Sequence, residues 1–122
     1  MQKLKSKDLR IGNYVMHNDE LKTIAVINCD DTVRVKDTNG EITGCWYTTL
    51  IEPIELTEEW LLKVGAVKLD FKDFPSFNLF GMQINFINGL WIEYVSRVEV
   101  TGIHHLQNIF FFRNSEELTF KD

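Results

Sequence analysis

Apolar and polar side chains alternate with a period of two over residues 32–36 (TVRVK). Three further segments of the first half are expected strands: 12–16, 21–28, which is rich in β-branched residues, and 41–47. A period of two is typical of half-buried strands. Asn39-Gly40 separates residues 32–36 from residues 41–47, and because both residues tolerate positive φ values we expect a hairpin closed by a type I′ turn. Short antiparallel strands this close together predict an SH3-like small β-barrel over residues 9–56.

A short helix is expected over residues 57–65. The Thr57 hydroxyl can cap the first free amides, and Glu58 and Glu59 then lie at the positive end of the helix dipole. Gly65 suits the left-handed position that ends many helices. Because the helix has only about two turns, packing rather than intrinsic propensity must stabilise it.

The second half of the chain begins with an expected strand near residues 66–71, followed by a loop. Segments 82–87 and 90–95 flank Asn88-Gly89 and predict a second antiparallel hairpin. A two-residue turn there gives two apolar cross-strand pairs, Phe86 with Trp91 and Ile87 with Leu90. Residues 118–120 are a candidate for a final edge strand.

The last long apolar segment, residues 102–114, fits a helix better than a strand. Its apolar positions and Arg113 recur at intervals of three and four: Ile103, Leu106, Ile109, Phe110 and Arg113. A strand over 103–112 is the alternative, because an Ile-Phe-Phe-Phe run has high β preference.

These elements together predict an α+β fold, with an N-terminal SH3-like barrel, a short helix, and an antiparallel hairpin packed with a C-terminal helix. We expect one domain over residues 1–122. Its subregions would be barrel-like strands at 9–56, the short helix at 57–65, and the hairpin and second helix at 66–120.

The charge balance argues against a nucleic-acid-binding surface. The chain of 122 residues has 13 basic and 18 acidic side chains and a net charge of −5, whereas tight binding to phosphate backbones needs a positive face. Lys3, Lys5, Lys7 and Arg10 form one basic cluster, either a solubilising tail or a phosphate-contacting arm. Without an apolar leader or a membrane-length segment, we expect a cytoplasmic protein.

Cys29 and Cys45 fall on expected neighbouring strands, so they can lie close together. In a reducing cytoplasm we expect two buried thiols that act as small hydrophobic residues. A disulfide or redox pair is the alternative. Two cysteines without a matching His or Cys pair do not make a zinc site.

No set of residues points to catalysis, and we expect neither a metal nor a cofactor. The candidate bases are His17, His104 and His105, but no nucleophile motif accompanies them. His104 and His105 would point about 100° apart on a helix, so they cannot share one small site, and we expect one of them to be structural. The glycines form no phosphate-binding loop. The sequence therefore predicts a non-enzymatic protein.

Aromatic side chains and acidic turns are the remaining candidates for contact with a partner. Fifteen residues are Phe, Trp or Tyr; either all of them fill the core or some form an exposed patch that anchors an interface. The partner-binding residues that we predict are Asp30, Asp31, Trp46, Tyr47, Phe112, Glu116 and Glu117.

Three segments carry a family resemblance. They are Leu9–Val15 (LRIGNYV), residues 54–65 (IELTEEWLLKVG), and residues 105–111 (HLQNIFF) followed by Glu116-Glu117-Leu118. In this order they resemble a family of small, uncharacterised proteins of Bacteroidetes phages and prophages with an LRIGN start and an H-x-LQN end. The chain is also similar in size and style to anti-CRISPR proteins directed at a type VI-B RNA-guided RNase. The motifs identify a family but carry no chemistry.

The resemblance implies a phage- or mobile-element-encoded protein that inhibits a host protein by contact, most specifically an RNA-guided RNase or its guide-RNA complex. An acidic surface can compete for a basic RNA channel without any active site. The alternative is a small nucleic-acid-binding module, in which barrel aromatics stack on bases.

Overall fold

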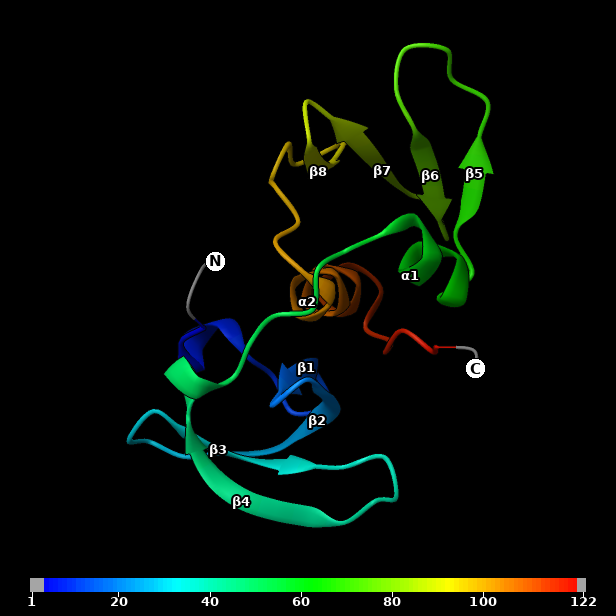
Figure 1. Ribbon diagram of the computed structural model, residues 1–122. Helices are drawn as coiled ribbons and strands as arrows, with labels where there is room; N and C mark the ends of the chain where they lie inside the picture. The colour runs from blue at the N-terminus through cyan, green and yellow to red at the C-terminus, as the bar shows by residue number, and fades with distance from the viewer. Residues whose placement is uncertain (1–3, 121–122) are drawn as a thin grey trace. The chain divides into compact units, whose positions relative to one another are not determined.

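The computed structural model describes residues 4–120, and its fold class is α+β, as expected (Figure 1). The strands are β1 (Tyr14–His17), β2 (Glu20–Ile27), β3 (Thr32–Lys36), β4 (Ile42–Tyr47), β5 (Val67–Leu69), β6 (Ser76–Leu79), β7 (Met82–Ile87) and β8 (Leu90–Glu93). The helices are α1 (Glu58–Lys63) and α2 (Ile103–Asn114), with single 3₁₀ turns at Ser6–Asp8 and Thr48–Leu50. Lys3 of the expected basic cluster lies outside the described residues.

The chain divides into two compact units. Unit 1 comprises Met1–Ile54 and Gly102–Asn108, and unit 2 comprises Glu55–Thr101 and Ile109–Asp122. Both units therefore take part of their structure from α2, whose first half belongs to unit 1 and second half to unit 2. That the chain forms one domain stays a prediction.

Unit 1 contains a four-stranded antiparallel sheet in the order β1-β2-β3-β4. The register shifts once between β2 and β3 and again between β3 and β4, and such bulges bend and twist a sheet. After β4 the chain returns to β1, where Met16 and Glu52 exchange two backbone hydrogen bonds of 2.9 and 2.8 Å. The outer edge of β1 is thus partly paired.

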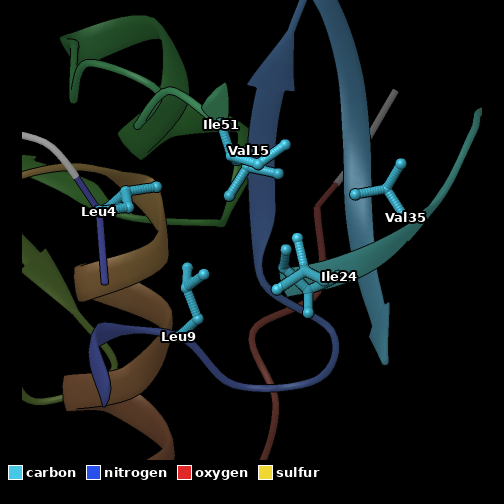
Figure 2. Close-up of a cluster of buried hydrophobic side chains, with 7 residues drawn as sticks. Leu4, Leu9, Val15, Ile24, Val35 and Ile51 are labelled. Carbon is cyan, nitrogen blue, oxygen red and sulfur yellow. The ribbon is translucent and has the colours of Figure 1, made fainter. Parts of the chain in front are cut away.

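The core of unit 1 lies on one side of this sheet, where apolar side chains from separate segments meet (Figure 2). Its buried members are Leu4, Leu9, Val15, Ile24, Val33, Val35 and Ile51. The strand residues follow the alternating pattern, and Leu4 and Leu9 join them from the N-terminal segment. Burial of several such side chains is the main stabilising contribution to the unit.

The hairpin predicted at Asn39-Gly40 is confirmed, but its type I′ turn is wrong. Of the two residues only Gly40 has a positive φ, and its amide donates to the Asp37 carbonyl at 3.0 Å. The Asp37 carboxylate accepts from the amides of Asn39 and Glu41 at 3.3 and 3.0 Å. The carboxylate thereby stabilises a longer turn that ends in a left-handed glycine, a common hairpin loop.

Unit 2 contains a second antiparallel sheet in the order β5-β6-β7-β8. The hairpin at Asn88-Gly89 is confirmed, both turn residues have positive φ, and the two predicted cross-strand pairs form. We expected a loop where β6 lies, because Pro75 and the polar residues before it obscured the start of that strand. Residues 118–120 form no strand.

The second strand of this hairpin ends at Glu93, two residues earlier than predicted, because the buried Glu93 side chain closes a turn. Its carboxylate accepts from the amides of Val95 and Ser96 at 2.8 and 3.1 Å and from the Arg113 guanidinium at 2.6 Å. Burial alone raises the pKa of Glu93, but these hydrogen bonds and the charge of Arg113 outweigh it and lower the pKa.

The α1 helix has the ends that its sequence predicts. The Thr57 hydroxyl accepts from the Trp60 amide at 3.2 Å. At the other end Gly65 has φ +91, its amide donates to Leu62, and the next amide, of Ala66, donates to Leu61. This pair of bonds is a Schellman motif, which requires the left-handed glycine.

The helix predicted over 102–114 is confirmed, and the strand alternative is wrong. Gly102 precedes it in a crowded position, where an added Cβ would lie 2.9 Å from the carbonyl oxygen of Ile54. That oxygen accepts from the Ile103 amide at 2.9 Å, so the start of α2 is fixed to the end of the first segment of unit 1. Ser115 ends the helix with φ +56, and its amide donates to the Phe111 carbonyl.

Candidate functional site

His104 is the buried member of the adjacent histidine pair at the start of α2. His104 is 3% exposed and its Nδ1 has no hydrogen-bond partner. Burial lowers the pKa of His104 to about 4; neighbouring His105 acts in the same direction and Asp8 opposes it. His104 is therefore a neutral interior side chain, as expected for one member of the pair. Within residues 4–120, no group of three or more His, Cys, Asp or Glu side chains is placed to hold a metal ion.

Cys29 and Cys45 are both free and exposed, so the expected burial of the two thiols is wrong. Cys29 lies in the turn after β2. In β4 the half-buried positions are Thr43 and Trp46, three residues apart, because the register shift adds a residue between them. Strict alternation would have placed Cys45 on the inner face, and the extra residue turns it outward.

The LRIGN and LQN motifs meet within unit 1 in one hydrogen-bond network. The Gln107 side chain accepts from the Tyr14 amide at 2.7 Å and donates to the Gly12 carbonyl at 3.1 Å. The Asn108 side chain accepts from Asn13 at 2.8 Å and from Arg10 at 3.0 Å. These side chains hold the N-terminal segment to α2, so the motif residues have a structural role.

The predicted residues of unit 1 gather at one end of its sheet. Tyr47 pairs with Thr32, and the Thr48 amide donates to the Asp31 carbonyl at 2.9 Å. This register brings Tyr47, which is 62% exposed, close to the turn that contains Asp30 and Asp31. A hydrogen bond from Thr32 lowers the pKa of Asp30.

Trp46 has less surface accessible to a partner than its neighbour Tyr47. Its ring packs against the core of unit 1 and lies 4.3 Å from the His17 ring, centroid to centroid. A Cβ on Gly44 would lie 2.2 Å from the indole nitrogen, so the indole covers the backbone of a left-handed glycine. Part of this ring therefore stabilises the sheet, and only its remaining surface can contact a partner.

A hollow of about 450 Å³ lies wholly within unit 2. It is lined by Val64, Gly65, Phe80, Phe110, Asn114, Glu116, Glu117, Leu118 and Thr119. The volume is within the range of ligand-binding clefts. Buried apolar side chains line part of it, and the carboxylates of Glu116 and Glu117 are also among its lining groups.

The end of α2 builds one side of this hollow. Phe110 and Asn114 are one turn apart and share a face of the helix. The left-handed residue Ser115 then redirects the chain, and buried Leu118 anchors the segment that carries Glu116 and Glu117. The structure thus places both predicted glutamates at the hollow.

Phe112 is 90% exposed, which agrees with its prediction as an accessible aromatic. Two helical positions from Phe110, it lies on nearly the opposite face of α2. Phe112 and the hollow are therefore separate features of unit 2.

Sequence reasoning missed Phe80, the most unusual residue at the hollow. It has φ +50 and is 66% exposed, although a positive φ is rare for a bulky side chain. Its ring meets Phe110 edge-on with centroids 6.0 Å apart. Phe80-Gly81 between two short apolar segments was the available signal, since glycine is frequent at the second position of tight hairpin turns.

No protein-family model matches the chain, and neither a curated protein nor a solved structure does. Between residues 4 and 120, no helix has both the length and the apolar character needed to cross a membrane.

Proposed function

We propose that the protein is a non-enzymatic binding protein, encoded by a phage or mobile element, that inhibits a host protein by direct contact in the bacterial cytoplasm. In the most specific form it is an anti-CRISPR inhibitor of an RNA-guided RNase. The observation that carries the proposal is the exposed Phe80, held in an unfavourable backbone conformation beside an apolar hollow with two carboxylates. Strained exposed aromatics of this kind are typical of recognition sites.

The physical basis of inhibition is charge and shape rather than chemistry. A nuclease that binds guide RNA has a basic channel, and a protein of net charge −5 is attracted to such a surface. Acidic groups speed the encounter, while buried aromatic anchors supply most of the affinity. Two surfaces offer both features: the end of the unit 1 sheet with Asp30, Asp31 and Tyr47, and the hollow of unit 2.

The test combines a purified type VI-B RNase loaded with guide RNA and the full chain. We expect the wild-type protein to bind the complex and to reduce target-RNA cleavage. Two charge-reversal variants assign the surface: Asp30→Lys with Asp31→Lys, and Glu116→Lys with Glu117→Lys. The proposal is contradicted if the chain neither inhibits the RNase nor retains any protein from a host lysate at low salt.

The alternative is a nucleic-acid-binding module built on an SH3-like barrel, and the arrangement of the unit 1 sheet favours it. The sheet order β1 to β4, its two register shifts and the return of Glu52 to Met16 support closure of this sheet into such a barrel. The net charge opposes phosphate binding. A salt-titrated RNA and DNA mobility-shift assay decides the matter: no shift at micromolar protein and low salt excludes this function.

A further inference from the structure

We propose that a small hollow of unit 1 is a binding site for a short-chain carboxylic acid. The hollow has a volume of about 220 Å³, and its lining includes His17, Glu20, Lys22, Val35, Thr43 and Trp46. All of these residues belong to unit 1. The inference goes beyond the proposed function, because it gives the protein a small-molecule ligand in addition to a protein partner.

The polar residues of this hollow lie on the inner face of the unit 1 sheet, which otherwise carries the apolar core (Figure 2). Residues that are paired across neighbouring strands share a face. Lys22 is paired with the core residue Val15, and Thr43 is paired with the core residue Val35. His17 follows Val15 by two positions in β1 and therefore lies on the same face. Polar groups on a core face are costly unless they find partners.

His17 supplies the observation that points to a ligand. It is 8% exposed, and its ring contacts the Trp46 ring. Within residues 4–120 the imidazole forms no hydrogen bond or ion pair. Its nitrogens are nevertheless not sealed in the interior, because across these residues the one sealed side-chain nitrogen or oxygen without a partner is Nδ1 of His104. The ring contact explains where the imidazole lies, but its nitrogens remain open to the hollow that the residue lines.

Two further groups of the lining can donate hydrogen bonds to a ligand. In the part of the chain that the structure describes, neither the indole N–H of Trp46 nor the hydroxyl of Thr43 has a hydrogen-bond partner. An indole nitrogen can only donate, whereas a hydroxyl can donate or accept. The indole lies over the backbone of Gly44 and against the His17 ring, so its position is fixed by packing. Donors held in place around a hollow favour a ligand with acceptor oxygens.

Lys22 gives the hollow its positive charge. Its side chain is 13% exposed, and its ammonium lies 3.1 Å from the Glu20 carboxylate. An ammonium has three N–H donors, and this ion pair uses one of them. The Glu20 side chain is 70% exposed, so it can stay in water while a ligand contacts the ammonium from within the hollow. A carboxylate matches this set of donors, because each of its two oxygens accepts charge-assisted hydrogen bonds.

The size of the hollow limits the ligand to a short chain. Its volume of about 220 Å³ is smaller than the sites of drug-sized ligands, which occupy about 300–1,000 Å³. Val35 is fully buried and contributes an apolar wall. An acid with an alkyl chain of about four carbons can therefore place its carboxylate on the donors and its methylenes on this wall.

The test uses four probes and the full-length, isotope-labelled protein. Butyrate presents a carboxylate on a short alkyl chain, and butyramide has the same shape without the charge. Butylammonium is a cation of similar size, and inorganic phosphate is an oxyanion without an alkyl chain. Amide chemical shifts are followed up to about 20 mM probe, because so small a ligand binds weakly. We expect butyrate to shift the amides of residues 17–22, 35 and 43–46, and to bind about tenfold more tightly than butyramide.

Two variants and one matched control identify the contacts. His17→Phe keeps a ring against Trp46 and removes both nitrogens, so the thermal midpoint should stay nearly unchanged while butyrate affinity falls about tenfold. Lys22→Met keeps most of the side-chain length and removes the charge, and it should lower the affinity by about tenfold or more. Lys36→Met makes the same change at an exposed position of β3 and should leave butyrate binding unchanged.

Four results would overturn the inference. Absence of shifts with every probe would mean that the hollow holds only water. Butyramide or butylammonium binding as tightly as butyrate would contradict recognition of a carboxylate. Phosphate binding as tightly as butyrate would mean that any small oxyanion suffices. Unchanged butyrate affinity in both His17→Phe and Lys22→Met would place the ligand elsewhere. These titrations contain no nuclease, so their outcome is independent of the test of inhibition.

Discussion

Two ionisable side chains in the interior, Glu93 and His104, differ in the hydrogen bonds available to them. Glu93 is 0% exposed and keeps three hydrogen-bond donors around its carboxylate, whereas the equally interior His104 has a ring nitrogen without any partner. The two residues therefore affect stability in different ways. For Glu93 the charged form is stabilised by its surroundings, and for His104 the charged form is excluded by burial.

His104 should make the protein less stable in mild acid. Its folded pKa of about 4 lies below the ordinary 6.5, so between these values the unfolded chain binds more protons. Stability is full above pH 6.5 and falls as the pH drops toward 4, by up to about 3 kcal/mol. Urea unfolding of the wild type and of His104→Met at pH 7 and pH 5 measures this. An equal loss of stability in both proteins would contradict the assignment.

The Glu93–Arg113 pair should contribute more than any exposed ion pair of unit 2. Arg113→Leu leaves the buried Glu93 carboxylate without its cationic donor, and we expect a loss of about 2 kcal/mol in the free energy of unfolding. Glu59→Ala breaks the exposed pair with Lys63 and should cost about 0.5 kcal/mol. Equal effects in chemical denaturation would show that burial adds nothing.

The Glu93–Arg113 pair gives the stability of the protein a second dependence on pH, in a more acidic range than that of His104. Since the pKa of Glu93 is lowered on folding, its contribution is present above the unfolded pKa and is lost as the pH falls through the folded value. In Arg113→Leu the acid unfolding transition should move to higher pH. Circular dichroism during acid titration measures the shift, and an unchanged midpoint would contradict it.

At the level of elements, the N-terminal segment and the first half of α2 depend on each other within unit 1. Gln107→Ala removes a side chain that bonds both the Tyr14 amide and the Gly12 carbonyl, and partly buried backbone groups that lose such a hydrogen bond destabilise the fold. We expect a loss of about 3 kcal/mol and faster hydrogen exchange at the Tyr14 amide. Gln107→Glu keeps the acceptor and loses the donor, so it should protect Tyr14 and recover part of the stability.

Elements that depend on local chemistry were predicted well. Thr57 and Gly65 marked the ends of α1, and Asn88-Gly89 marked the second hairpin, because capping and turn preferences act over a few residues. The β6 strand was missed because Pro75 and the polar residues before it obscure its start, and because its pairing with β5 is not recorded in the local sequence. The Cys45 error has the same origin, since one extra residue in β4 reverses the faces of the strand.

Across the whole molecule, the sequence predicts which types of residue form the candidate site better than it predicts the individual residues. Acidic and aromatic residues were predicted to bind a partner, and Glu116 and Glu117 do line the unit 2 hollow. Phe80 was not identified, because its significance depends on a backbone angle and on exposure, which composition does not reveal. Trp46 was chosen for its size, although much of its ring contacts His17 and the sheet core.

The division of α2 between the two units has a consequence for synthesis on the ribosome. All four strands of unit 1 precede residue 54, yet the Asn13 side-chain amide donates to Asn108 and the Tyr14 backbone amide donates to Gln107, both of which lie in α2. A nascent chain of about 100 residues therefore contains two sheets but lacks the helix that both units need. Completion of both units should coincide with the emergence of α2, so the protein is expected to acquire protease resistance late and in one step.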